Sequence, residues 1–290
     1  MKWEDFRPSG NVEDRRGMRM PGGAGGVGIG TLVVVGLVGW ALGINPLVLL
    51  SGLDAIQGGG SPTQQSAQPQ GRHGAPTDEL GRFADRVLAQ TEEVWTGLFR
   101  AQGRTYQEPT MVLFSGATRS ACGGASSAMG PFYCPLDKKV YLDLGFFQEM
   151  KTRFKAPGDF AAAYVIAHEV GHHVQNITGI LPKVQEAQRT ARSRAEANAL
   201  SVRTELMADC LAGVWAHHAN ARFRILEPGD VEEALNAASA IGDDKLQERA
   251  QGRVVPDSFT HGTSEQRVTW FTRGLKSGSM QQCNALQGAI

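Results

Sequence analysis

The sequence lacks several features that would assign it to common protein classes. None of its four cysteines forms a C-x-x-C pair, which argues against a zinc knuckle built from thiolates. Its 29 basic and 29 acidic residues cancel, so no overall electrostatic attraction to nucleic acid is expected. It contains no internal repeat, which excludes a solenoid. What remains is a chain of 290 residues, enough for one large domain or two small ones.

Charge is also missing from a long apolar stretch near the N-terminus. Residues 27–44, "VGIGTLVVVGLVGWALGI", contain no charged side chain and would span roughly 27 Å as a helix. Arg15, Arg16 and Arg19 precede this stretch, whereas no Lys or Arg occurs at positions 46–71. The positive-inside rule therefore predicts a cytoplasmic N-terminus and a single crossing of the membrane. A cleaved secretory signal is the alternative, but no convincing small-x-small cleavage site follows the apolar run.

The predicted anchor divides the chain into four segments. We place a cytoplasmic segment at residues 1–26 and the transmembrane anchor at residues 27–50. Residues 51–77 are rich in Gly, Gln, Ser and Pro and cannot bury enough apolar surface to fold, so a flexible linker is expected. Residues 78–290 would form the folded domain outside the cytoplasm. Two G-x-x-x-G spacings in and beside the anchor are compatible with a homo-oligomer of packed helices.

All four cysteines are candidates for disulfide bonds. An even number permits two disulfides in an oxidising compartment, and four cysteines allow three pairings. We favour a bond between Cys122 and Cys134, because both lie in a loop rich in Gly, Ser and Pro. The other two candidates are Cys210 and Cys283. Four reduced cysteines are the alternative as long as the compartment is not known.

Hydrophobic periodicity predicts a mostly helical α+β domain with a small sheet. Two runs predict strands, at residues 110–115 and 139–146. Pro182 is expected to separate two helices, and Thr263 with Gln266 has the spacing of a capping box. The expected helices occupy residues 78–98, 159–178, 183–221, 229–250 and 263–276.

The stretch "YVIAHEVGHHVQNITG" at residues 164–179 contains the pattern H-E-x-x-H. His168 and His172 are four residues apart, so on a helix they lie on one face and can share a zinc ion. Glu169 lies about 100° further round the helix, beside the open coordination position, where it can take a proton from water. His173 faces away from this edge and is not expected to be a ligand.

The apolar setting of this helix argues against a chance occurrence of the pattern. Between Phe160 and Pro182 the only formal charge is that of Glu169. A helix of this composition is expected to be buried, and a lone buried carboxylate is costly unless it is paired or lies beside a metal ion. Structural histidines are the alternative interpretation, since a histidine on a helix more often packs than binds metal.

A catalytic zinc needs a third protein ligand, which we expect on the helix that includes residues 203–222. The only formal charges between Arg203 and Arg222 are Glu205 and Asp209, which are four apart and share a face. Small alanines flank these acids and an apolar face lies opposite, so the helix is expected to be buried on both sides. We predict that Glu205 binds zinc and that Asp209 accepts the N–H of a ligand histidine. An exposed alanine-rich face with two acids is the alternative.

These motifs give the sequence a resemblance to a known family. It resembles the neutral zinc metallopeptidases predicted among bacterial single-pass membrane proteins, in its N-terminal apolar run and in the stretches "ACGGASSAMGPFYCPLDKKVYLDLGFF", "YVIAHEVGHHVQNITG", "ELMADCLAGVW" and "FTHGTSEQRVTWF". H-E-x-x-H followed by E-x-x-x-D on a later helix is similar to the gluzincin arrangement. The resemblance covers residues 78–287 and the anchor, and implies a zincin-like fold, a zinc cofactor and a peptide or protein substrate. It also implies a bacterial inner-membrane protein with its domain in the periplasm.

The resemblance further suggests roles for side chains outside the helices. In zincins an edge strand beside the active-site helix holds the substrate by main-chain hydrogen bonds, which assigns residues 139–144, with Tyr141 and Asp143, to substrate binding. His261 would donate a hydrogen bond to the tetrahedral oxyanion. Tyr133 and Tyr141 are alternative donors, and a structural role is the alternative for His261.

The sequence thus predicts a membrane-anchored zinc peptidase in which Glu169 is the general base and then the general acid. His168, His172 and Glu205 would bind the zinc ion, and no nucleic acid partner is expected. Two alternatives stay open: a catalytically inactive zincin-fold binding module for an envelope partner, and a zinc amidase that acts on cell-wall crosslinks. The intact glutamate argues against the binding module, which would have no need of it.

Overall fold

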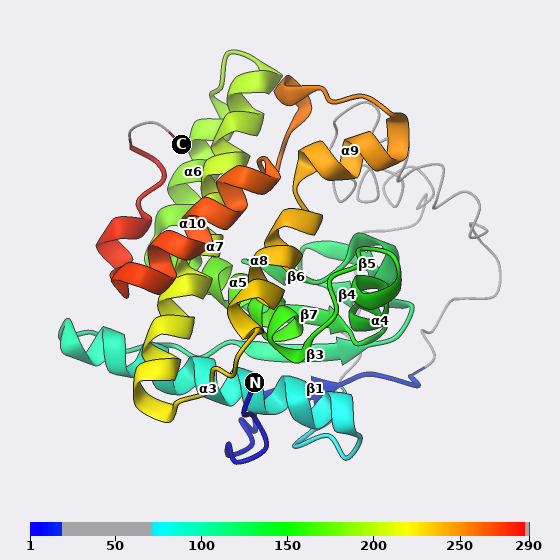
Figure 1. The fold of residues 1–290 in the computed structure, drawn as a ribbon, viewed down its shortest axis with the longest axis vertical. Coiled ribbons are helices and arrows are strands. Elements are labelled where there is room, and N and C mark those ends of the chain that lie inside the picture. Colours follow the sequence, from blue (N-terminus) through cyan, green and yellow to red (C-terminus); the bar gives the residue numbers. More distant parts are fainter. Residues whose placement is uncertain (19–70, 288–289) are drawn as a thin grey trace, which may run out of the picture.

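The computed structural model describes residues 1–18, 71–287 and 290, which fold into a sheet and a group of helices (Figure 1). The five-stranded sheet has the order β2-β1-β3-β7-β6. Strands β1, β3 and β7 are parallel, and the two edge strands β2 and β6 are antiparallel to their neighbours. A separate antiparallel hairpin consists of β4 and β5. The strands are β1 (Val12–Asp14), β2 (Arg72–His73), β3 (Thr110–Phe114), β4 (Ala117–Ser120), β5 (Gly123–Ser126), β6 (Phe132–Cys134) and β7 (Lys139–Asp143).

The helices make up most of the fold and surround α5, the helix that carries H-E-x-x-H. α5 is buried along most of its length and packs against α3, α7 and α8 and against strands β6 and β7. α10 lies along α7 (Figure 1). The expected mostly helical α+β fold with a small sheet is therefore confirmed. The helices are α3 (Glu79–Ala101), α4 (Gly145–Thr152), α5 (Asp159–Ile177), α6 (Ile180–Arg189), α7 (Arg194–Phe223), α8 (Asp230–Ala240), α9 (Asp243–Gln251) and α10 (Ser264–Ser277).

Glycines allow α5, α7 and α10 to approach one another closely. A Cβ added to Gly171 of α5 would lie 3.0 Å from the carbonyl oxygen of Ala208 on α7. The contact between α7 and α10 is tighter still, because a Cβ on Gly274 would lie 1.9 Å from the carbonyl oxygen of Cys210. These close contacts bring residues from three helices, far apart in the sequence, into one small region of the core.

Two of the expected helices are each divided in two. Residues 183–221 contain a break after α6, and Ser193 caps the start of α7 by accepting a hydrogen bond from the backbone N–H of Glu196 (3.1 Å). Pro182 lies in the first turn of α6, where a helix does not need its missing N–H, so it does not separate helices as predicted. The expected helix 229–250 is likewise α8 followed by α9. The capping box at Thr263 is confirmed.

The N-terminal segment is part of the folded domain, which the sequence did not predict. β1 lies between β2 and β3, so the predicted boundary at residue 26 is corrected: residues 1–18 belong to the same unit as residues 71–287. Glu13 of β1 is buried and accepts hydrogen bonds from Arg15 and Lys139, both at 2.7 Å. Burial alone would raise the pKa of Glu13, but these two cations lower it to about 2.

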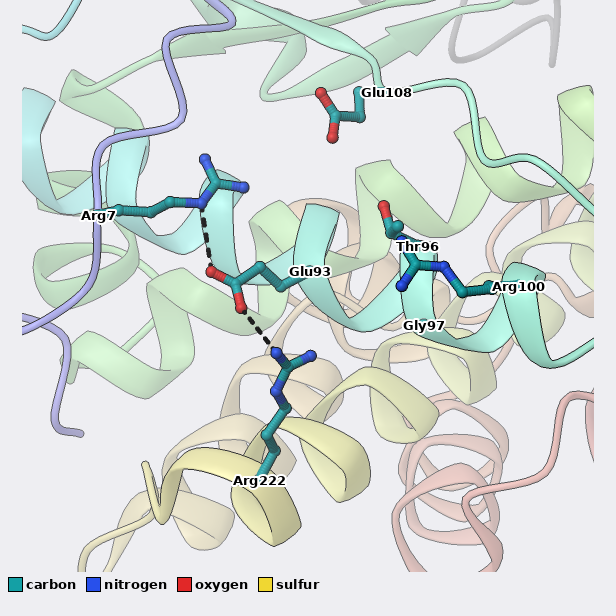
Figure 2. Close-up of a pocket in the computed structure, with 7 residues that line it drawn as sticks. All are labelled: Arg7, Glu93, Thr96, Gly97, Arg100, Glu108 and Arg222. Carbon is teal, nitrogen blue, oxygen red and sulfur yellow. Dashed lines mark hydrogen bonds and ion pairs between the residues drawn. The ribbon is translucent and has the colours of Figure 1, made fainter.

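Ion pairs also hold the N-terminal segment against the helices. Figure 2 shows Glu93 of α3 between two arginines, Arg7 of the N-terminal segment and Arg222 of α7, at 3.2 and 3.4 Å. The three side chains line a surface pocket of about 260 Å³. The amino group of Met1 donates hydrogen bonds to Asp159 and Asp230, at 2.7 and 3.2 Å. The segment is therefore fixed to α3, α5 and α8.

The predicted anchor at residues 27–50 lies outside the described residues. Among the residues that the structure describes, no helix is both long enough and apolar enough to cross a membrane. The predicted linker is described only from residue 71 onward, where Arg72 and His73 form β2. β1 and β2 pair with each other, so the residues that flank positions 19–70 lie in one sheet. A single crossing by the anchor would put those flanks on opposite sides of the membrane, which this sheet does not allow.

Candidate metal centre

Three predicted ligands come together between α5 and α7. His168 Nε2 lies 3.0 Å from one carboxylate oxygen of Glu205, and His172 Nε2 lies 3.3 Å from the other. Atoms bound to a tetrahedral zinc at roughly 2.0–2.1 Å are separated by about 3.3–3.4 Å, so the donor set fits a zinc ion with small adjustments. Two imidazoles and one carboxylate also leave a position for water, as catalytic zinc sites require.

The charges of these three residues are coupled. Burial alone would lower the pKa of His168, but Asp209 and Glu205 raise it to about 10. Burial would raise the pKa of Glu205, and the two histidines hold it well below its usual range. The carboxylate therefore interacts favourably with positive charge at this position, whether it is carried by the imidazoles or by a divalent cation.

Each histidine is oriented through the other nitrogen of its ring. His168 Nδ1–H donates to Asp209 at 2.9 Å, and His172 Nδ1–H donates to the side-chain oxygen of Gln175 at 2.9 Å. The Gln175 amide in turn donates to the carbonyl oxygen of Thr204 at 2.7 Å. These contacts fix the tautomer that leaves Nε2 free to bind a metal. The geometry matches the role predicted for Asp209.

Glu169 lies next to His168 in the chain and is buried. Burial raises the pKa of its carboxyl, and the neighbouring histidines oppose this effect without cancelling it. A carboxylate whose pKa is shifted toward neutrality is a better proton acceptor than one in water. This environment suits the predicted general base.

His173, the third histidine of the motif region, lies on the opposite side of α5. Its Nε2–H donates to the carbonyl oxygen of Gln107 at 2.5 Å, and Tyr133 Oη–H donates to Nδ1 at 3.0 Å. Burial lowers the pKa of His173 to about 4. The ring is thus a neutral structural group, which agrees with the prediction that it is not a ligand.

His261 lies in the loop before α10, where Asp243 at the start of α9 holds it. Its ring Nδ1 is 3.1 Å from one Asp243 oxygen. The other Asp243 oxygen accepts hydrogen bonds from the backbone N–H groups of Thr260, His261 and Gly262. Partial loss of solvent around the ring would lower the pKa of His261, but Asp243 and the charge of Glu205 raise it. The side chain is about half exposed, at 49%.

The sequence of the chain matches a known protein family. The family model described as "Putative neutral zinc metallopeptidase" matches residues 1–286. The chain belongs to this family. The match includes the N-terminal segment with β1, and the family's description implies a zinc ion and a peptide substrate.

Curated relatives match most or all of the chain. "Uncharacterized protein YpfJ" of Escherichia coli strain K12 is 50% identical over 301 residues, which cover 100% of both chains. "Uncharacterized protein Rv2575" of Mycobacterium tuberculosis strain H37Rv is 42% identical over 225 residues, or 73% of each chain. No solved structure matches the chain significantly. The relatives thus support the family and name no substrate.

The substrate-binding strand predicted from the sequence requires correction. β7 pairs with β3 on one side and β6 on the other, so its main chain is not free to hold a peptide. Tyr141 is fully buried and donates to Asp137 at 2.7 Å, and Asp143 accepts the N–H groups of Gly116 and Gly145. The edge strand next to α5 is β6. It was missed because three residues, "FYC", are too few to show alternation.

The favoured disulfide between Cys122 and Cys134 is present, and the other two candidate cysteines form a second one. Cys122 is bonded to Cys134, which ties the β4–β5 hairpin region to the edge strand β6. Cys210 is bonded to Cys283, which ties α7 to the C-terminal segment. The second bond also removes Cys210 as a ligand, in agreement with its predicted position off the ligand face. Two disulfides are typical of an oxidising compartment.

Sequence reasoning missed four residues that support the metal centre. Tyr164 and Arg267 both donate hydrogen bonds to Asp209, Gln175 orients His172, and Asp243 orients His261. Arg267 left a signal in the sequence: it stands three, four and seven residues before buried Trp270, Phe271 and Gly274 of α10. That spacing puts the arginine on the buried face of a helix, where an unpaired charge would be costly.

Proposed function

We propose that the protein is a zinc-dependent peptidase whose active site lies between α5, α7 and α10. The observation that carries this proposal is the convergence of His168, His172 and Glu205, with contacts of 3.0 and 3.3 Å between their ligand atoms. A zinc ion bound there would supply a Lewis acid that activates water and polarises the scissile carbonyl. Membership of a zinc metallopeptidase family supports the same reaction class.

Glu169 would perform the proton transfers of the reaction. Its carboxylate would take a proton from the attacking water and deliver it to the nitrogen of the leaving amine. Burial supports this role, because it raises the pKa of Glu169 above that of an exposed glutamate. The ring of His261, held by Asp243, would donate a hydrogen bond to the oxyanion as negative charge develops. Its raised pKa favours the protonated ring that such a donor needs.

The substitution Glu169→Gln tests this mechanism. Zinc content should stay near one equivalent, because the ligand set is unchanged, while cleavage of a peptide library should fall by about 10²–10⁴-fold. Glu205→Gln is the matched variant, and it should lose zinc as well as activity because it alters a proposed ligand. Full proteolysis by the Glu169→Gln protein would contradict the proposal. Zinc binding without cleavage by the wild type would instead favour the non-enzymatic binding module.

We further propose that the domain works outside the cytoplasm, beside a membrane. Support comes from the two disulfides and from the uncharged sequence at residues 27–44. The pairing of β1 with β2 and β3 adds a condition, because it requires residues 1–18 on the same side of the membrane as residues 71–287. Membrane attachment through residues 27–44 would therefore leave both flanks on the extracytoplasmic side.

A further inference from the structure

Arg267 is a fully charged side chain in the core, and the mechanism above gives it no role. It extends from α10 and is 2% exposed. Its Nε–H and Nη2–H donate to the two oxygens of Asp209, each at 2.9 Å. Nη1–H reaches the carbonyl oxygen of Ile241 at 3.4 Å, at the junction between α8 and α9. The guanidinium therefore lies where α7, α10 and the α8–α9 junction meet.

Asp209 of α7 accepts hydrogen bonds from two other helices. One of its oxygens accepts Tyr164 Oη–H at 2.5 Å and His168 Nδ1–H at 2.9 Å, both from α5. Arg267 adds its paired donors from α10, and Asp209 itself is completely buried. A planar guanidinium that binds both oxygens fixes the plane of a carboxylate, which a single ammonium group cannot do. The rotation of Asp209, and with it the direction of the His168 ring, is set from α10.

We propose that Arg267 is a positioning residue for the metal centre. By holding Asp209 in one rotation, it keeps His168 in the tautomer and orientation that present Nε2 beside Glu205. Arg267 Nη2 also lies 3.4 Å from His168 Nδ1, but that nitrogen already donates its proton to Asp209. The arginine therefore acts on zinc affinity through Asp209. This inference rests on the proposed function, because it takes the three convergent side chains as the zinc site. It extends that function by assigning a role to a residue outside the H-E-x-x-H and E-x-x-x-D motifs.

Zinc affinity of the full-length protein tests the proposal without reliance on catalysis. The affinity is measured by competition with a chromogenic chelator, after circular dichroism has shown that each variant is folded. Arg267→Lys keeps the charge and loses the paired donors, so it should weaken zinc binding by about 10–100-fold. Asp209→Asn should weaken it to a similar extent. The double variant Arg267→Met with Asp209→Asn should bind zinc no more weakly than Asp209→Asn alone, because the arginine acts through the aspartate.

Two further variants keep the test decisive. Arg267→Met alone leaves a buried carboxylate without a cation and is the variant most exposed to misfolding, whereas the double variant removes both charges. Lys276→Met also replaces a cation with methionine on α10, but at an exposed position. Its zinc affinity should stay within twofold of the wild type. A spectrum of the Co²⁺-loaded protein adds a second readout, and Arg267→Lys should shift its visible bands as Asp209→Asn does.

The outcomes separate this inference from the proposed function. A folded Arg267→Lys protein with wild-type zinc affinity would overturn the positioning role and leave the zinc site intact. Independent losses that add in the double variant would overturn it too, because they would show that Arg267 does not act through Asp209. Failure of the wild-type protein to bind zinc at all would overturn the proposed function and this inference together.

Discussion

Protonation of His173 should destabilise the fold, because the ring is buried as a neutral group. The pKa of His173 is about 4 in the folded protein, against an ordinary value of 6.5. A histidine whose folded-state pKa is lowered contributes stability that is fully present above pH 6.5 and is lost as the pH falls toward 4. The proton would compete with the hydrogen bond that Tyr133 donates to Nδ1.

The size of the effect follows from the two pKa values. Their difference, 6.5 minus 4, corresponds to about 3.4 kcal/mol when the change is complete. The linkage relation gives a loss of about 1.4 kcal/mol at pH 5.5 and about 2.6 kcal/mol at pH 4.5. Losses of this size are a large part of the total stability of a typical domain.

The assay compares urea unfolding of the wild-type protein and His173→Gln between pH 7.5 and pH 4.5, with EDTA present throughout. Glutamine can donate to the Gln107 carbonyl but does not titrate, so the difference between the two proteins isolates His173. Groups that titrate in both proteins, including His168 and the carboxylates, cancel in that difference. If the two stability curves stay parallel down to pH 4.5, the pKa of His173 is not lowered in the folded protein and the prediction is wrong.

Two other predictions concern helix packing and the N-terminal segment. Gly274→Ala should destabilise the protein by about 3 kcal/mol or more, because the new Cβ would lie 1.9 Å from the Cys210 carbonyl oxygen, a backbone atom. Gly97→Ala, at an exposed site on α3 with nothing within 4 Å, should instead stabilise it by up to about 1 kcal/mol, and thermal unfolding of both variants checks the contrast. Cysteines introduced at exposed Asp5 and Glu265 should both react with a membrane-impermeant maleimide in spheroplasts, because β1 and β3 share a sheet. Labelling at Glu265 alone would restore the single-crossing topology and exclude the pairing of β1.

The central site was largely accessible from the sequence because helical spacing determines geometry. His168 and His172, and likewise Glu205 and Asp209, are four residues apart, so each pair necessarily shares a face of its helix. α5 and the part of α7 between Arg203 and Arg222 also carry very few charges, which indicated burial. Contacts between distant segments carry no such signature, and Arg267 reaches Asp209 from α10 only because Gly274 lets that helix approach α7.

The sheet was harder to predict for a related physical reason. β1 and β6 contain three residues each, which is too short for alternation to be recognised, and their partners are selected by tertiary contacts. As a result β7 was assigned to an edge that β6 occupies. The break before α7 was hidden because Ser193, its cap, resembles an ordinary polar residue within a helix.

The position of β1 has a practical consequence for recombinant work on this protein. A truncated protein that begins at residue 78, the boundary suggested by composition, would lack both β1 and β2 and would expose the long edge of β3. Unpaired edges of this kind favour aggregation. A better recombinant form would connect residue 18 to residue 71 by a short glycine and serine linker. This is feasible because residue 18 follows β1, residue 71 precedes β2, and the two strands are paired. Failure of a shorter fragment to fold or to bind zinc would then be a result of the missing strands, not of the metal site.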